Sequence, residues 1–391
     1  MQLHGLPFPG REREQAMLAQ TVADLGRGRS SVVTLIGRPG YGQSRLLNLA
    51  ARLAEDQGFR VLRAKATPGE RDVRYGVVGQ LLAPMEGLTE GTLKALTGHG
   101  PESRLPGLTE LLRTGRDRPT LLVVDDVEWL DPASHRWFGA LIRRLSDARM
   151  VLLVSGTGRL RPGACSLSTA PQQVITLELE LDPLAMRDVA ATVALICGRP
   201  ADNAFTSAAL EASAGNPQVL SEALRRFTKR GYAPVAGRVP ELCAITDAVG
   251  GEHVLRVLGG LSDTAVAVVR ALAVCGDLLD LSLLYALAGP RAASEPGLPE
   301  TLQESGLATA SGTGLRLSRP EARSWILAEM PGEERAELHA RAAELAYRAA
   351  VPDEDIARLL LAAGPVDEPW VIPVLRRTCA AALRAGRTAQ A

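Results

Sequence analysis

This sequence contains few aromatic residues and few lysines, and it has no excess of positive or negative charge. Aromatic residues make up 4% of the 391 residues, so the core must be built mainly from leucine, valine and alanine. The 44 basic and 44 acidic side chains give a net charge of zero. That balance argues against a dominant nucleic-acid-binding or anionic-membrane surface. Only Lys65, Lys94 and Lys229 are lysines, so arginine carries most of the positive charge.

Features of secreted, membrane and metal proteins are also missing. No apolar run approaches the roughly 20 residues that cross a bilayer, and the charged stretch GREREQ at 10–15 stands where a signal peptide needs an apolar core. The five cysteines are odd in number, lie far apart and form no CxxC pair, which predicts reduced thiols. The five histidines are equally dispersed. We therefore expect a cytoplasmic globular protein with no membrane partner.

Up to about residue 182, the chain alternates between apolar, strand-like runs and segments of helical periodicity. The strand-like runs lie at 32–36, 59–64, 120–124, 151–154 and 174–179, and helices are predicted at 44–57 and 132–145. Strands separated by helices predict crossover connections and a parallel, doubly wound α/β sheet. The all-apolar run TLLVV at 120–124 is typical of a strand that is buried on both faces.

Beyond residue 182 the pattern becomes helical, and the changes in pattern predict four domains. These are the α/β domain at 1–182, a helical domain at 183–260, a third domain at 261–330 and a helical tail at 331–391. In the third domain, three helices precede two short alternating runs joined by SGTG, which is the pattern of a winged helix. The alanine-rich tail predicts the first helices of an antiparallel repeat array.

The strongest chemical signal is GRPGYGQS at 37–44, a glycine-rich stretch between an apolar strand and an amphipathic helix. That context is the one that a phosphate-binding loop requires. Glycines let the backbone N–H groups turn inward around an anion, and the helix start adds positive charge. The predicted phosphate-binding residues are Gly37, Arg38, Pro39, Gly40, Tyr41, Gly42, Gln43, Ser44 and Arg45, with Ser44 also placed to hold Mg²⁺. The alternative is a glycine-rich turn that binds no ligand.

This loop departs from the pattern GxxxxGK[ST] because Gln43 stands where the lysine belongs. A glutamine donates a neutral hydrogen bond worth about 1 kcal/mol, against about 1.5–3 kcal/mol for a charged one. It also cannot neutralise charge that develops on transferring phosphate. Arg45 points about 100° away around the helix and is a poor substitute. We therefore expect weakened nucleotide affinity and low or absent hydrolysis.

A pair of carboxylates follows the buried strand at 120–124. Asp125 is the candidate Mg²⁺ ligand, and Asp126 is the candidate catalytic group that polarises an attacking water. Two adjacent carboxylates repel each other unless a cation lies between them, which favours metal binding over a solvated acidic turn. Glu128 is interpreted as a surface charge and Asp131 as a helix N-cap.

Two weaker signals lie farther along the chain. Arg159 follows the strand at 151–154, where it is either a catalytic sensor of the terminal phosphate or an ordinary arginine at a strand end. The turn SAGNPQVL at 213–220 places Asn216 as an N-cap and Pro217 at a helix start.

Together these residues resemble the STAND class of P-loop ATPases, with an AAA ATPase domain. More narrowly, they are similar to the N-terminal part of the large ATP-binding regulators of the LuxR type. The matching pieces are FPGRERE at 8–14, the loop at 37–44, LLVVDDVEWLDPAS at 121–134, VLLVSGTGR at 151–159, LELDPL at 179–184 and AGNPQVL at 214–220. A later run with LSDTAVAVVRALAV resembles that family's winged-helix region.

The resemblance implies a sheet of order 5-1-4-3-2, a helical lid over the nucleotide, and ATP or ADP with Mg²⁺ as cofactors. It places Phe8, Gly10, Arg11 and Pro217 near adenine. It also implies a conformational switch in signal transduction and transcription regulation, driven by nucleotide state and a small-molecule or protein inducer, with self-association as a further expectation.

Two departures from the family limit these expectations. Gln43 puts catalysis in doubt, and the chain ends where the repeats would begin, before any helix-turn-helix output domain. Residues 251–330 also carry more acidic than basic side chains, so we expect no direct DNA binding by this chain. The alternatives are an interaction scaffold that has lost nucleotide binding and a metabolic P-loop enzyme such as a small-molecule kinase.

Overall fold

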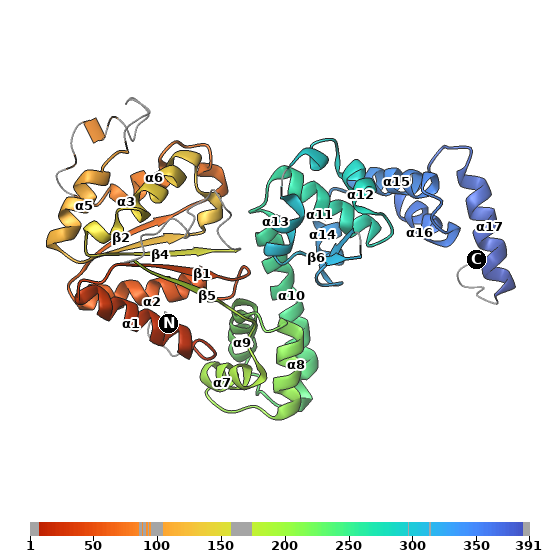
Figure 1. Cartoon of the computed structure of the whole chain (residues 1–391). Coiled ribbons are helices and arrows are strands. Elements are labelled where there is room, and N and C mark those ends of the chain that lie inside the picture. Colours follow the sequence, from red (N-terminus) through yellow and green to blue (C-terminus); the bar gives the residue numbers. More distant parts are fainter. Residues whose placement is uncertain are drawn as a thin grey trace. The chain divides into compact units, whose positions relative to one another are not determined.

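The computed structural model describes residues 8–85, 88, 91–92, 94, 105–157, 174–295, 297–312 and 314–385. The chain divides into two compact units, Met1–Val249 and Gly250–Ala391 (Figure 1). Among the described helices, none combines the length and the apolar character that crossing a membrane requires. The finer four-domain division stays a prediction.

The first unit is built around a five-stranded parallel sheet in the order β2-β3-β4-β1-β5. The strands are β1 Ser31–Ile36, β2 Arg60–Lys65, β3 Thr120–Asp125, β4 Met150–Gly156 and β5 Ile175–Glu180. This order confirms the expected 5-1-4-3-2 arrangement of a doubly wound P-loop NTPase fold. The connections that follow the adjacent strands β1 and β4 lead to opposite edges of the sheet, and open α/β sheets bind their ligands at such a point.

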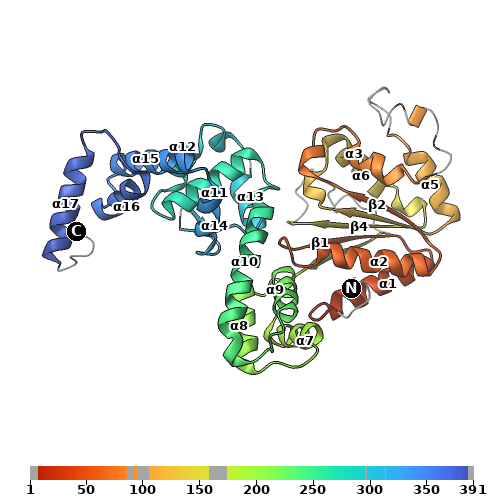
Figure 2. The same ribbon diagram turned by 180° about the vertical axis from the view of Figure 1, so that it is seen from behind.

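Alternate side chains of the central strands point to opposite faces of the sheet and pack into two separate hydrophobic cores. Leu121 and Val123 of β3 pack with α1 and α2 on one face, whereas Leu122 and Val124 pack with α3, α5 and α6 on the other. Figures 1 and 2 show these two groups of helices on opposite faces of the sheet. These helices are α1 Glu12–Gly26, α2 Gln43–Asp56, α3 Gly76–Leu82, α5 Leu108–Asp117 and α6 Pro132–Ile142. The strand period of two therefore explains why TLLVV is apolar throughout.

Asp131 caps the start of α6, as the sequence predicts. Its Oδ1 accepts hydrogen bonds from the N–H groups of Ala133 (3.1 Å) and Ser134 (2.9 Å), and Pro132 occupies the first helical position. The same oxygen accepts the N–H of Tyr75 at 2.9 Å, so the cap also ties α6 to the start of α3.

Helices follow the sheet in the remainder of the first unit. They are α7 Met186–Cys197, α8 Asn203–Ser213, α9 Pro217–Lys229 and α10 Val239–Leu258, the last of which continues past residue 249. Their apolar cluster is centred on Phe205 and Phe227, whose ring centroids lie 5.2 Å apart.

The second unit contains helices and one antiparallel hairpin. Its elements are α11 Asp263–Cys275, α12 Leu281–Ala288, α13 Leu298–Glu304, β6 Ala308–Ser311, β7 Gly314–Leu317, α14 Ala322–Glu329, α15 Gly332–Arg348, α16 Asp353–Ala363 and α17 Val371–Arg384. The predicted order of three helices and a hairpin is present, while the winged-helix assignment stays a prediction. Short 3₁₀ turns occur in both units at Pro68–Glu70, Val127–Trp129, Leu145–Asp147, Ala236–Arg238 and Ala292–Ser294.

Candidate nucleotide-binding site

The glycine-rich loop lies between β1 and α2, at the carboxyl edge of the sheet. Gly40 and Gly42 have φ angles of 85° and 100°, a region that strains other residues. The N–H of Gly37 donates to the carbonyl of Gly156 at the end of β4, at 3.2 Å, which fixes the start of the loop beside the neighbouring strand. The first turn of α2 carries no acidic residue, so its positive end remains available to an anion.

Gln43 is the first residue of α2, and its side chain folds back across the loop. Its Nε2 donates a hydrogen bond to the carbonyl oxygen of Gly37. The amide therefore bridges the two ends of the loop. A Cβ atom at Gly37 would lie 3.1 Å from this nitrogen, so a larger residue here would push the Gln43 amide out of place.

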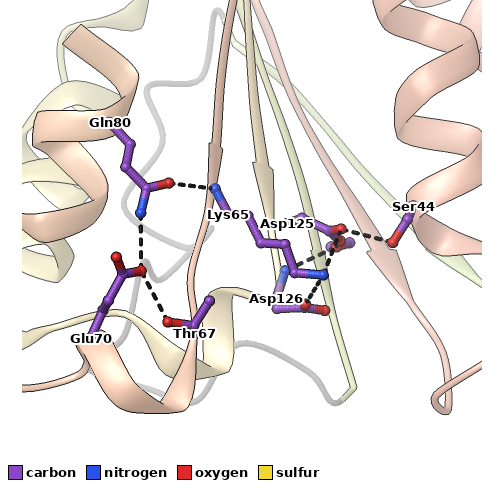
Figure 3. A network of polar contacts seen from close by, with 8 residues as sticks. Ser44, Lys65, Thr67, Glu70, Gln80, Asp125 and Asp126 are labelled. Atoms are coloured by element: carbon purple, nitrogen blue, oxygen red, sulfur yellow. Dashed lines mark hydrogen bonds and ion pairs between the residues drawn. The ribbon is translucent and has the colours of Figure 1, made fainter. Parts of the chain in front are cut away.

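Ser44 joins the loop to the acidic end of β3. Its Oγ donates to Oδ2 of Asp125 at 2.7 Å (Figure 3). The other oxygen of Asp125 accepts a hydrogen bond from the hydroxyl of Ser155, at the end of β4. The loop, β3 and β4 thus converge at one edge of the sheet.

Asp126 turns away from the strand with a φ angle of 59°, in the left-handed region. Its N–H donates to Oγ of Ser155 at 3.2 Å. Burial and the neighbouring Asp125 raise the pKa of Asp126, against the opposing effect of Lys65, whose Nζ lies 3.1 Å from Oδ2 of Asp126 (Figure 3). A raised pKa makes this carboxylate a better proton acceptor.

Lys65 is a site residue that the sequence analysis did not identify. It ends β2, and the sheet register pairs it with Asp125. Burial lowers the pKa of Lys65, but the carboxylates of Asp126 and Asp125 outweigh this effect and raise it. The signal in the sequence was a rare lysine at the end of a strand, although the order of strands was needed to place it beside the acidic pair.

The oxygen atoms at this edge suit a magnesium ion. Mg²⁺ prefers oxygen ligands and usually keeps several waters, so one hydroxyl and one carboxylate are a sufficient protein contribution. Ser44 and Asp125 provide that pair. Among the described residues, no group of three or more His, Cys, Asp or Glu side chains forms a self-contained metal site. The residues present therefore fit an ion that shares its ligands with phosphate.

Phe8 lies against the back of the loop. A Cβ atom at Gly42 would lie 2.4 Å from Cζ of Phe8, and the ring is 8% exposed. The guanidinium of Arg45 lies 4.4 Å from the centre of the same ring. Phe8 thus supports the loop, and Arg45 is engaged with Phe8. The roles of both residues toward a nucleotide stay predictions.

We predict that Gly42→Ala destabilises the first unit more than Gly58→Ala does. Gly58 also has a positive φ, 73°, but has open space around its Cβ position. The backbone strain alone costs about 1 kcal/mol, and displacing Phe8 adds about 1–3 kcal/mol at position 42. Urea unfolding of both variants measures the difference, and equal losses of stability would show that Phe8 does not constrain the loop.

Arg11 connects three segments of the first unit. It is 3% exposed, and its Nη2 donates to the carbonyl oxygens of Tyr41 (3.3 Å) and Asp182. Gly10, with a φ of 77°, leaves no space for a side chain because Asp188 and Leu184 surround it. Arg11 therefore holds the loop against the end of β5, while its predicted contact with adenine stays a prediction.

The turn before α9 contacts the loop directly. Asn216 caps α9 by accepting the N–H groups of Gln218 (3.0 Å) and Val219 (3.1 Å), as expected. Its Nδ2 also donates to the carbonyl of Pro39 at 3.1 Å, and the N–H of Gln218 donates to the carbonyl of Gly40 at 3.1 Å. The helical segment and the loop therefore share hydrogen bonds.

Three further predicted residues complete the set. Pro217 is buried at the first position of α9, and Arg38 is exposed on the loop. Arg159 lies outside the described residues. The assignment of these residues to phosphate, base or catalysis stays a prediction.

The interpretation of Glu128 as a surface charge is wrong. Its Oε2 is buried without a hydrogen-bond partner. Burial raises the pKa of Glu128 from about 4.5 to about 7, against the weaker opposing effect of hydrogen bonds that include one with Thr157. Thr157 is the last described residue after β4, so this contact depends on a long-range neighbour that the local sequence did not reveal.

We predict that Glu128→Gln stabilises the first unit at pH 8 and has little effect at pH 5. The folded protein favours the neutral form of Glu128, because the pKa of this carboxyl is higher in the folded than in the unfolded state. The free energy of unfolding therefore falls as the pH rises from about 4.5 to about 7, where a neutral glutamine avoids the cost of a buried charge. The variant should gain about 1–3 kcal/mol in the free energy of unfolding at pH 8. Denaturant unfolding at both pH values measures this, and a gain of the same size at pH 5 would contradict it.

Comparisons with known proteins agree with this geometry. Residues 7–154 match the AAA ATPase domain family. A comparison with curated protein sequences finds no significant match. Among solved structures, a Walker-type ATPase of Pyrococcus abyssi is similar with a TM-score of 0.50 and 13% identity, covering 83% of this chain and 99% of that chain.

Two other solved structures align with lower TM-scores. The RuvB Holliday junction branch migration motor of Thermotoga maritima aligns at 0.45 with 16% identity, covering 83% of this chain and 97% of that chain. A STAND protein with a tetratricopeptide repeat sensor from Pyrococcus horikoshii aligns at 0.39 with 14% identity, covering 96% of this chain and 51% of that chain. Sheet order, loop position and sequence match agree: residues 7–154 match the AAA ATPase domain family, and the described strands have the order of the P-loop NTPase fold.

Proposed function

We propose that the first unit binds ATP or ADP with Mg²⁺ at the loop of residues 37–44 and acts as a nucleotide-dependent switch. The observation that carries this proposal is the 2.7 Å hydrogen bond from Ser44 to Asp125. It brings the start of α2 and the acidic end of β3 together at the edge where parallel α/β sheets bind ligands.

The residues divide into complementary roles under this proposal. The loop N–H groups and the start of α2 surround the phosphates, and Ser44 and Asp125 hold the metal ion, which supplies positive charge to the phosphate oxygens. Asp126, with its raised pKa, orients and deprotonates the attacking water. Gln43 leaves the loop without its charged donor, so we expect binding with slow or absent hydrolysis.

Nucleotide binding can reach the rest of the first unit through the turn before α9. Asn216 and Gln218 hydrogen-bond to loop carbonyls, so a change in loop conformation shifts the position of α9. This coupling supports a STAND-type switch rather than a metabolic kinase. The finer proposal is a cytoplasmic regulator of the LuxR type, which responds to an inducer, self-associates and leaves DNA contact to another domain.

Calorimetric titration of the full chain with ATP and ADP, with and without Mg²⁺, tests the proposal. We expect saturable binding with a Kd between about 1 μM and 1 mM, corresponding to about 4–8 kcal/mol, and tighter binding with Mg²⁺. The exposed carboxylate of Asp56 at the end of α2 offers a control variant, Asp56→Asn, which should bind like wild type. No saturable binding at millimolar nucleotide would reject the proposal.

One observation favours a second candidate, a scaffold that has lost nucleotide binding. The Gln43 amide bridges the loop by donating to the Gly37 carbonyl, which stabilises the loop without a ligand. A scaffold of this kind predicts that millimolar MgATP leaves the thermal unfolding midpoint unchanged. A bound nucleotide instead raises the midpoint, because it stabilises only the folded state.

A further inference from the structure

Lys65 places its ammonium group at the point where the loop and the carboxylates converge. Its Nζ lies 3.1 Å from Oδ2 of Asp126 and 3.9 Å from Oδ2 of Asp125, the oxygen that accepts the hydroxyl of Ser44 (Figure 3). The side chain remains 60% exposed. A positive charge therefore lies beside the proposed metal ligands and remains open to solvent.

The direction of the side chain follows from the pleat of β2. Arg63, two residues earlier, lies on the same face of the strand and hydrogen-bonds to Asn48 and Glu55 of α2. Side chains two residues apart share a face, so Lys65 extends toward the side of the sheet that α2 covers. Ser44 is the second residue of the same helix. Lys65 thus approaches the loop from the neighbouring strand.

A second layer of hydrogen bonds holds the backbone of Lys65 in place. Its N–H donates to Oε1 of Gln80 at 3.0 Å, and Nε2 of Gln80 donates to Oε2 of Glu70 at 3.0 Å (Figure 3). The hydroxyl of Thr67 donates to the same oxygen of Glu70 at 2.9 Å. The end of β2 is therefore fixed, and only the flexible part of the lysine side chain has to move.

The loop itself lacks a comparable charge at its usual position. Gln43 is neutral, and Arg45 lies over Phe8. Arg38 is exposed on the loop and is the competing source of positive charge. Lys65 differs from Arg38 because it already lies beside Asp125 and Asp126, where charge on the terminal phosphate would be neutralised.

We infer that Lys65 supplies, from β2, the positive charge that the loop lacks at Gln43, and that it contacts the terminal phosphate of bound ATP. The inference rests on the proposed nucleotide binding. A charge-assisted hydrogen bond to phosphate explains how the loop can bind a triphosphate without a lysine of its own.

Calorimetric titration of Lys65→Met with ATP, in EDTA and in Mg²⁺, tests the inference. We expect the affinity for ATP to fall about tenfold in both conditions, because a direct contact with phosphate does not depend on the metal. Lys229→Met, a change of the same kind at an exposed position at the end of α9, should bind like wild type. Lys65→Arg should retain most of the affinity, and adding Gln43→Lys to Lys65→Met should restore it.

The opposite result separates this inference from simpler explanations. If Lys65 is only a counter-ion of the acidic pair, its removal frees Asp125 and Asp126 for Mg²⁺. Affinity in EDTA then stays unchanged and affinity in Mg²⁺ rises, which overturns the inference. A loss with Arg38→Met but not with Lys65→Met also overturns it. Absence of binding by wild type rejects the proposed function instead, and circular dichroism of each variant identifies a folding defect.

Discussion

Gln43→Lys is expected to raise ATP hydrolysis about tenfold or more and to tighten binding of MgATP. The lysine replaces a neutral donor with a charged one, worth about 1–2 kcal/mol in additional affinity. The larger effect falls on hydrolysis, because the ammonium neutralises charge that develops as the phosphoryl group is transferred. The hydrogen bond from Gln43 to the Gly37 carbonyl is also released, so the loop can open around phosphate.

Steady-state phosphate release by wild type, Gln43→Lys and Gln43→Met measures this effect. Methionine keeps the length of the side chain but has neither the amide nor a charge, so it separates the release of the Gly37 carbonyl from the gain of charge. We expect Gln43→Met to remain as slow as wild type. If Gln43→Lys binds ATP but hydrolyses it no faster than Gln43→Met, the missing lysine is not what limits turnover.

Asp125→Asn is expected to lower the affinity for MgATP about tenfold or more and to leave the affinity for ATP in EDTA nearly unchanged. The amide is a weaker metal ligand than the carboxylate, which lowers the affinity for MgATP. Without the metal, the substitution removes a negative charge that repels the phosphates, so the affinity for ATP in EDTA does not fall. Ser44 and Ser155 both donate to the carboxylate, but their hydroxyls can rotate to meet an amide, so folding should be preserved.

Titrations of Asp125→Asn and of the control Asp56→Asn, each in Mg²⁺ and in EDTA, measure the metal-dependent part of the affinity. Lys65→Met should weaken binding in both conditions, whereas Asp125→Asn should do so only with the metal present. Equal affinities for MgATP in Asp125→Asn and wild type would remove Asp125 from the proposed metal site.

Local patterns were sufficient to predict most elements of the first unit that position the site. The apolar run before Gly37, the glycines that follow it, and TLLVV before Asp125 each predicted the correct element, because a strand buried on both faces carries a continuous apolar signal. The sheet order came from the family resemblance and not from the residues themselves. The helices α1, α3 and α5 were not predicted from the sequence.

The parts of the site that could not be predicted depend on contacts between distant segments. Lys65 reaches Asp126 from the neighbouring strand, and Glu128 forms a hydrogen bond with Thr157, which follows β4. Arginine side chains are usually exposed, but Arg11 is buried and donates hydrogen bonds to two main-chain carbonyls. Such roles are determined by the order of strands and by the packing of loops, which local periodicity does not encode.

Amide hydrogen exchange of the full chain, with and without saturating MgADP, tests the central claim most directly. The claim is that the N–H groups of 37–44 and the carboxylate of Asp125 face one bound polyphosphate. It predicts slower exchange in peptides that cover 37–46 and 122–128, because bound phosphate and metal restrict both segments. Unchanged exchange at both segments under conditions that saturate binding, or slowing confined to residues 250–391, would contradict it.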